Sequence, residues 1–77
     1  MNNRNRMNIK KDIGTKIKVL RAKHSINQTE LAKGLGTTQR SISKWETGKN
    51  MIDLESLLAI CRIFDISLSH FDPKEEP

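Results

Sequence analysis

The chain has 77 residues, of which 35% are hydrophobic and 30% are charged, which suits one small domain and leaves no room for a second domain or a deep catalytic cleft. Its net charge of +5 is unevenly placed: residues 1–50 carry twelve Lys or Arg against three acids, and residues 51–77 carry two against six. A basic half favours a polyanionic partner, and nucleic acid ranks ahead of a membrane because no stretch pairs a broad apolar face with a basic one.

The same composition predicts a soluble, cytoplasmic protein. The sequence contains no run of about 18 apolar residues, and the first residues, MNNRNRMNIKKD, lack the apolar segment of a signal peptide. The single Cys61 cannot form an internal disulfide framework.

Residues 1–11 are expected to form a flexible basic arm. Its cations Arg4, Arg6, Lys10 and Lys11 could enter a flanking minor groove or follow phosphates. The alternative is a disordered start without a role.

Helical periodicity predicts two helices in the first half of the chain. Asp12 is available as the N-cap of a helix over residues 13–24, in which Ile13, Ile17 and Leu20 share one face. Asn27 can cap a second helix over residues 28–35, with Glu30 in the capping-box position and Gly36 ending the helix.

Three further short helices are expected, and no strand, because nothing alternates with period two. Thr37 or Thr38 can cap a third helix that runs to about Thr47. Asp53 can cap a fourth, whose apolar stripe consists of Leu54, Leu57, Leu58, Cys61 and Phe64, widened by Ile60 and Ile63. A last turn, capped by Ser67, contains Leu68 and Phe71.

The third predicted helix has one apolar and one polar side. At about 100° per residue, Trp45 lies near Ile42. The opposite side carries Arg40, Ser43, Lys44 and Thr47, with Gln39 beside it.

Glu46 is the exception, because its position lies near the apolar side. A buried carboxylate needs a paired cation, and Arg21, at the edge of the first helix's apolar face, is the predicted partner since arginine can hold a carboxylate with two parallel hydrogen bonds. The alternative is two independent solvated charges.

Residues 28–48, QTELAKGLGTTQRSISKWETG, form a candidate helix-turn-helix. Ala32 is small where the next helix must cross closely, Gly36 can adopt the positive φ of the turn, and Ile42 fixes the second helix on the first.

From Ile13 to Phe71 the sequence resembles the Cro and phage-repressor type of helix-turn-helix, which includes the xenobiotic-response-element-like proteins. The resemblance runs through IGTKIKVLRAKHSINQTELAKGLGTTQRSISKWETGK and LESLLAICRIFDISLSHF. It implies an all-α, lambda-repressor-like DNA-binding domain of five helices over residues 12–71, followed by an acidic tail over residues 72–77. It also implies that helix 3 enters the major groove and that dimers bind two half-sites.

The resemblance implies two sets of DNA-contacting residues. Base edges would be read by side chains of the third helix, namely Thr38, Gln39, Arg40, Ser43 and Lys44. Phosphates would be held by residues at the start of the second helix and past the third, namely Asn27, Gln28, Thr47, Lys49 and Asn50. Alternatively, Asn27 is only a cap, and Arg40 and Lys44 are solvated charges.

The sequence departs from the family pattern after the third helix, where Asn50-Met51-Ile52 replaces the usual proline-containing linker. Two apolar side chains in a loop that should be exposed suggest a contact between two copies. The resemblance implies a dimer contact around this loop and the last helix. The predicted interface residues are therefore Met51, Ile52, Leu68 and Phe71. The alternative is that Ile52 merely covers the end of the fourth helix.

The residues give little support for an enzyme. His24 and His70 are isolated, Cys61 has no matched histidine, and no carboxylate pair, phosphate loop or metal-ligand cluster is present. We therefore expect no cofactor, no metal and no small-molecule ligand. The predicted function is that of a phage-like repressor acting as a homodimer on a roughly palindromic operator. The alternative is an antitoxin or restriction-system controller whose main contact is a partner protein, because fold alone does not separate these roles.

Overall fold

The computed structural model describes residues 3–73, with side chains from Ile9 onward. Four α-helices and one 3-10 helix follow one another along the chain: α1 (Asn3–Lys23), α2 (Gln28–Leu35), α3 (Gln39–Glu46), α4 (Leu54–Phe64) and η1 (Leu68–Phe71). The described residues contain no strand. The predicted all-α class is therefore confirmed, with the fifth helix reduced to a single 3-10 turn.

The start of α1 differs from the prediction. The helix begins at Asn3, ten residues before the expected start at Ile13, so residues 3–11 are its first turns. Asp12 is not an N-cap, and its carboxylate instead pairs with Lys16 one turn later, at 3.1 Å. Ile9 packs against the hydrophobic core one turn before Ile13, which continues the apolar face toward the N-terminus. The side chains of Arg4 and Arg6 lie outside the described residues.

The predicted caps of α2, α3 and α4 are confirmed. Asn27 and Glu30 form a reciprocal capping box, with each side chain accepting a hydrogen bond from the other residue's backbone N–H at 2.8 Å. Thr38 accepts from the N–H of Ser41 at the start of α3. Asp53 accepts from the N–H of Ser56 in the same way at the start of α4. These side chains fix where each helix begins.

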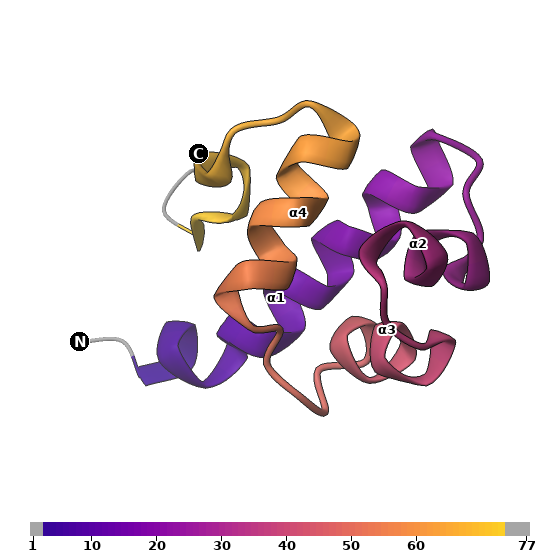
Figure 1. The fold of residues 1–77 in the computed structure, drawn as a ribbon. Helices are drawn as coiled ribbons and strands as arrows, with labels where there is room; N and C mark the ends of the chain where they lie inside the picture. Colours follow the sequence, from indigo (N-terminus) through magenta and orange to yellow (C-terminus); the bar gives the residue numbers. More distant parts are fainter. Residues whose placement is uncertain (1–2, 74–77) are drawn as a thin grey trace.

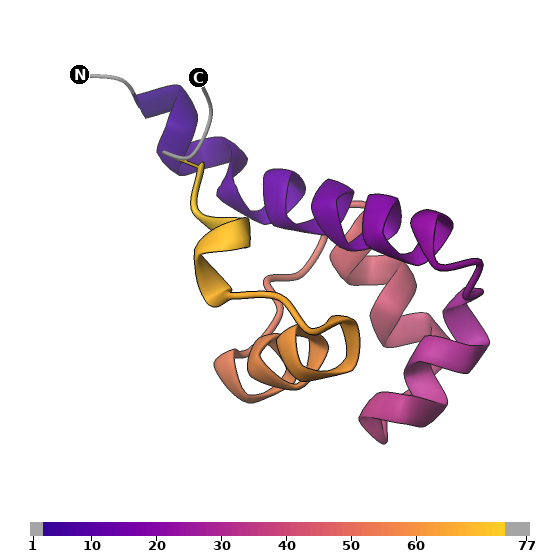
Figure 2. The same cartoon turned by 90° about the horizontal axis from the view of Figure 1, so that it is seen from above.

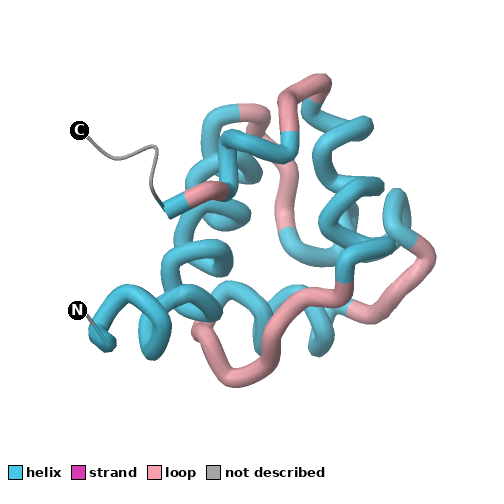
Figure 3. The backbone as a smooth tube through the Cα atoms, turned by 90° about the vertical axis from the view of Figure 1, so that its left-hand side faces the viewer, coloured by secondary structure: helices cyan, strands magenta, loops and turns pink. Residues whose placement is uncertain are grey.

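One long helix organises the domain. Figure 2 shows α1 along one side, with α2 and α3 packed near its C-terminal part and α4 beside them. The first turns of α1 and η1 lie at the same end of the molecule (Figure 1), and the connections between helices are short (Figure 3). The most deeply buried side chains come from α1, α2, α3 and α4, namely Ile17, Leu31, Ile42 and Ile60. No helix in the described part of the chain is long and apolar enough to cross a membrane.

The apolar surface of α4 is only partly buried. Leu57, Ile60, Cys61 and Phe64 face the core, whereas Leu54, Leu58 and Ile63 are 63%, 40% and 42% exposed. The predicted stripe was too wide because the rest of the domain covers one side of α4.

Two of the four predicted interface residues lie inside the domain. Ile52 is 5% exposed and Phe71 is 3% exposed, and both belong to the core cluster. The expectation that Ile52 would be exposed is wrong, because the loop turns its side chain inward just before α4 begins. Met51 and Leu68 remain 47% and 43% exposed.

Candidate nucleic-acid interface

The two sides of α3 differ as the sequence predicts. Ile42 is fully buried and Trp45 is 7% exposed, so these residues anchor the helix on the core. Gln39 and Arg40 at its start are exposed, and Ser43 and Lys44 are half-buried. The polar side of α3 is therefore open to a partner.

The turn between α2 and α3 depends on Gly36. This residue has φ of 72°, a left-handed conformation that glycine adopts without strain. The N–H of Thr37 donates to the Ala32 carbonyl at 2.9 Å and closes the end of α2. Ala32 is 3% exposed, in agreement with the predicted close crossing of the two helices.

Glu46, at the end of α3, is held by Arg21 from α1. The Arg21 Nε donates to Glu46 Oε2 at 2.6 Å and its Nη2 to Oε1 at 2.9 Å, so the pair is bidentate as the sequence predicts. The side chains are only 14% and 3% exposed. The hydrogen bond to Glu46 raises the pKa of Arg21 above its ordinary value, and the guanidinium stays charged. Its Nη1 donates to the Ile26 carbonyl at 2.9 Å.

Gln28 extends this pair to the exposed start of α3. Its Nε2 donates to Glu46 Oε1 at 2.9 Å, and its Oε1 accepts from Gln39 Nε2. We call the connected set of Arg21, Glu46, Gln28 and Gln39 the polar network. It joins α1, α2 and both ends of α3, so the orientation of α3 is fixed by hydrogen bonds as well as by its apolar anchors.

The predicted base-reading residues share one side of the domain but differ in their internal bonds. The Thr38 hydroxyl is occupied by the cap and also donates to Ser41 Oγ at 3.1 Å, which leaves the methyl group as the remaining feature of this exposed side chain. Gln39 is bound to Gln28. Arg40 is exposed, and Ser43 and Lys44 follow one turn later on α3.

The predicted phosphate-contacting residues lie at two places. Asn27 uses only its Oδ1 in the cap, so its amide group can still donate. The Thr47 hydroxyl donates to the Ser43 carbonyl at 3.0 Å. Past α3, Lys49 and Asn50 are exposed, and their N–H groups donate to the Lys44 carbonyl at 2.9 and 3.3 Å, which closes the end of the helix. Gln28 is the exception, because its amide is engaged on both atoms by the polar network.

α1 and α3 approach each other so closely that one position must be glycine. A Cβ placed on Gly14 would lie 2.0 Å from the carbonyl oxygen of Trp45, which is backbone and has no flexible end to move. The sequence interpretation missed this contact. The only available signal was a glycine inside a helical pattern, which often marks a packing requirement.

The sequence interpretation also missed the two bonds made by Gln28. Its position at the first turn of α2 predicted a phosphate contact, but no local pattern indicates a side chain that reaches another helix.

The described residues contain no group of three or more His, Cys, Asp or Glu that could hold a metal ion. Cys61 is 8% exposed, and its burial raises the pKa of the thiol, as expected for a core residue and not for a nucleophile.

Comparisons with known proteins agree with this geometry. A helix-turn-helix family model matches residues 17–71. The crystal structure of the P22 c2 repressor in complex with a synthetic operator superposes with a TM-score of 0.71 at 30% sequence identity, covering 77% of this chain and 89% of that chain.

Two curated relatives are similar over the same region. A protein of Pyrococcus abyssi named as an HTH-type transcriptional regulatory protein is 38% identical over 55 residues, which cover 71% of this chain and 17% of that protein. The antitoxin PezA of Streptococcus pneumoniae is 36% identical over 55 residues, which cover 71% of this chain and 35% of that protein. The chain thus spans only 17% and 35% of the length of these two relatives. The family match covers most of the chain, and the chain belongs to the helix-turn-helix family, of the Cro and phage-repressor type that its sequence resembles.

Proposed function

We propose that this chain is a sequence-specific, double-stranded DNA-binding transcription regulator that places α3 in the major groove. The observation that supports this most is the pairing of an exposed polar face on α3 with the partly buried polar network that holds the helix in one orientation. Base readout needs hydrogen-bonding groups fixed in position before the partner arrives. The likeness to the P22 c2 repressor, whose structure contains an operator, supports the same mode.

The readers differ in the bases that their chemistry suits. Arg40 can donate two hydrogen bonds to the O6 and N7 of guanine, and Gln39 can pair with the N6 and N7 of adenine. The Thr38 methyl suits a thymine methyl. Ser43 and Lys44 extend the reading face by one turn. Asn27, Thr47, Lys49 and Asn50 surround these residues as phosphate contacts.

Selection of bound sequences from a random DNA pool tests this function. The parent is expected to enrich one motif. Arg40→Ala should relax the preference at one position of that motif, with a loss of about 1 to 3 kcal/mol in discrimination.

Arg62→Ala, which removes an exposed arginine from α4 instead, is the matched control and should enrich the parental motif. A parent that enriches nothing contradicts the function, and an Arg40→Ala variant with the parental motif contradicts the assigned reading face.

The regulator is proposed to act as a homodimer on a roughly palindromic operator, with two copies of α3 in successive major grooves about 34 Å apart. Occupancy of the site would then block or redirect transcription.

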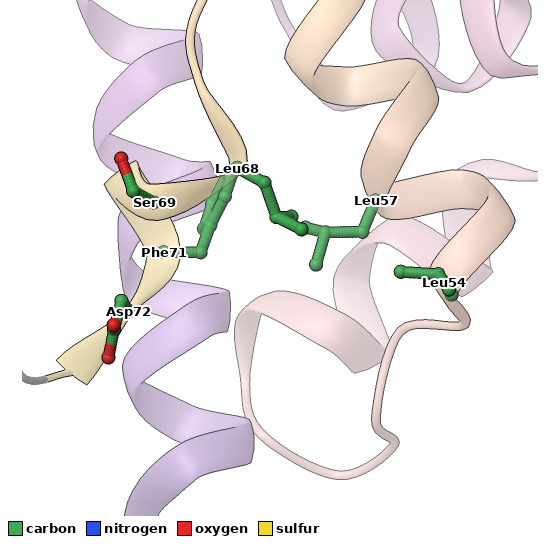
Figure 4. Close-up of a pocket in the computed structure, with 6 residues that line it drawn as sticks. All are labelled: Leu54, Leu57, Leu68, Ser69, Phe71 and Asp72. Atoms are coloured by element: carbon green, nitrogen blue, oxygen red, sulfur yellow. The ribbon is translucent and has the colours of Figure 1, made fainter.

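An apolar groove beside the exposed interface candidates supports the homodimer. The groove has a volume of about 350 Å³ and lies between α4 and η1. Its lining residues are Leu54, Leu57, Leu68, Ser69, Phe71 and Asp72. In Figure 4, Leu57 and Leu68 point toward each other across it. Phe71 therefore contributes to the wall of the groove, whereas Met51 and Leu68 offer exposed apolar surface of the kind that a second copy covers.

Sedimentation measurements on the parent and on a Leu68→Ser variant test the dimer. The parent should be dimeric at tens of micromolar or on operator DNA, and Leu68→Ser should weaken the association. Val19→Ser removes a similarly exposed apolar side chain, 48% exposed on α1, and should leave the association of the two copies unchanged. A parent that stays monomeric, also on DNA, is incompatible with the homodimer.

The second candidate function is that of an antitoxin or restriction-system controller whose main contact is a protein. The similarity to the antitoxin PezA favours it, and the groove between α4 and η1 would then take the partner. Purification from the native host separates the two functions. A stoichiometric partner protein supports this second function, whereas a homodimer without a partner supports the regulator.

A further inference from the structure

We propose that Lys11 of α1 contacts a DNA phosphate, so that the DNA-binding surface continues from the end of α3 onto the first helix. This inference rests on the proposed function. It adds α1, which lies outside the helix-turn-helix, to the set of elements that touch DNA.

The position of Lys11 is set by Gly48, the residue that follows α3 and its cap. Gly48 has φ of 78°, and a Cβ placed on it would lie 3.1 Å from both the Cα and the Cβ of Lys11 and 3.5 Å from its Cγ. The stem of the lysine therefore packs directly against the turn that ends α3. Lys49, a predicted phosphate contact, is the next residue in that turn.

A second contact keeps α1 in this register. Gly14 lies against the Trp45 carbonyl, as Lys11 lies against Gly48. The two contacts are three residues apart on α1 and three residues apart at the end of α3. Three residues are close to one helical turn. The two contacts together leave little freedom for α1 to slide along α3, and Lys11 stays against Gly48, the residue before Lys49.

The charges around this point are positive. Lys11 and Lys49 are exposed, and Lys44 is half-buried one turn earlier in α3. The two neighbouring carboxylates are each held by another cation, since Asp12 pairs with Lys16 and Glu46 with Arg21. Clustered lysines whose nearby acids are neutralised elsewhere repel one another and are suited to a phosphate.

The loop after α3 shows why a contact from α1 is useful. It carries Lys49 but continues with Asn50 and Met51, which have no charge. Lys11 adds a cation at the same place from a different part of the chain.

The salt dependence of DNA binding tests the proposal. Each phosphate contact contributes about 0.9 to the slope of log affinity against log salt concentration. Lys11→Gln keeps the part of the side chain that packs on Gly48 and removes the charge. It should lower the slope by about 0.9, so that its affinity deficit relative to the parent shrinks roughly 3.5-fold between 50 and 200 mM salt. Lys11→Arg should restore the parental slope.

Lys23→Gln is the matched control. Lys23 is also an exposed lysine of α1, but it lies about a third of a turn round the helix and roughly 18 Å further along it. Its loss should leave the slope unchanged. Equal slopes for Lys11→Gln and the parent would overturn the proposal, and so would an equal loss of slope in Lys23→Gln, because the effect would then come from net charge alone.

The measurement is made on the selected motif and on a random-sequence duplex. A parent that enriches no motif would contradict the proposed function. The slopes on random duplex would still decide for or against Lys11, because a phosphate contact carries no sequence preference.

Discussion

Replacement of Gly14 by alanine is expected to push α1 away from α3. The added Cβ would start 2.0 Å from the Trp45 carbonyl oxygen, where real Cβ atoms essentially never come within 3.0 Å. The two helices must therefore separate by about 1 Å. Inside a helix, alanine is more stabilising than glycine by roughly 0.5 to 1 kcal/mol. Overpacking of this kind lowers the stability of the fold by about 1 to 3 kcal/mol, and by more when the groups that clash belong to the backbone. We expect a net loss of about 2 kcal/mol.

Gly34→Ala is the matched control, because it makes the same change inside α2. A Cβ at Gly34 meets only the Cδ1 of Ile63, at 3.4 Å, which is an ordinary contact. This variant should gain up to about 1 kcal/mol. Urea unfolding of both variants gives the free energies. For a domain of this size the Gly14→Ala midpoint should fall by roughly 10 °C in a thermal scan. A Gly14→Ala variant as stable as Gly34→Ala would refute the reasoning.

Three other perturbations have defined outcomes. Arg21→Ala should cost about 3 kcal/mol because it leaves the Glu46 carboxylate buried, and a double-mutant cycle with Glu46→Ala in urea should show strong coupling, so additive losses would contradict the ion pair. Hydrogen bonds from Ser56 hold the pKa of Asp53 below its ordinary value, so its cap stabilises fully at neutral pH and this contribution is lost as the pH falls through the lowered pKa. Asp53→Asn, which caps without titrating, should therefore lose less stability than the parent below about pH 4, and parallel acid titrations of the two proteins would argue against this role. Cys61 should resist thiol reagents in the native protein and react on unfolding, whereas fast native labelling would contradict its burial.

Local chemistry explains which elements could be predicted from the sequence. The caps Asn27, Thr38 and Asp53 each bond to a backbone group three residues away, so their signal lies in short stretches of sequence. The pair of Arg21 and Glu46 was also predictable, because a carboxylate on the apolar side of a helix needs a cation.

The start of α1 was not predictable in the same way. Asp12 can either cap a helix or pair with a lysine one turn later, and the sequence around it fits both. The packing of Ile9 on the core favours the longer helix. Tertiary contact therefore decided between two local options.

The burial of loop residues depends equally on tertiary structure. Ile52 lies outside any helix, so periodicity gives no direction for its side chain, and only the placement of α4 turns it inward. The contacts of Gln28 are of the same kind, since they join residues 18 and 11 positions apart in the sequence.

The bond between Gln39 and Gln28 has a consequence for how new operator preferences could arise. Arg40 is exposed and is not part of the polar network, so in the proposed reading face its replacement would change the bases that are read while the hydrogen bonds of the network remain. Gln39 lacks this independence, because any substitution there also alters the partner of Gln28 and, through it, the surroundings of Glu46. Divergence among related regulators should therefore be easier at position 40 than at position 39, where a change calls for a second, compensating change at position 28.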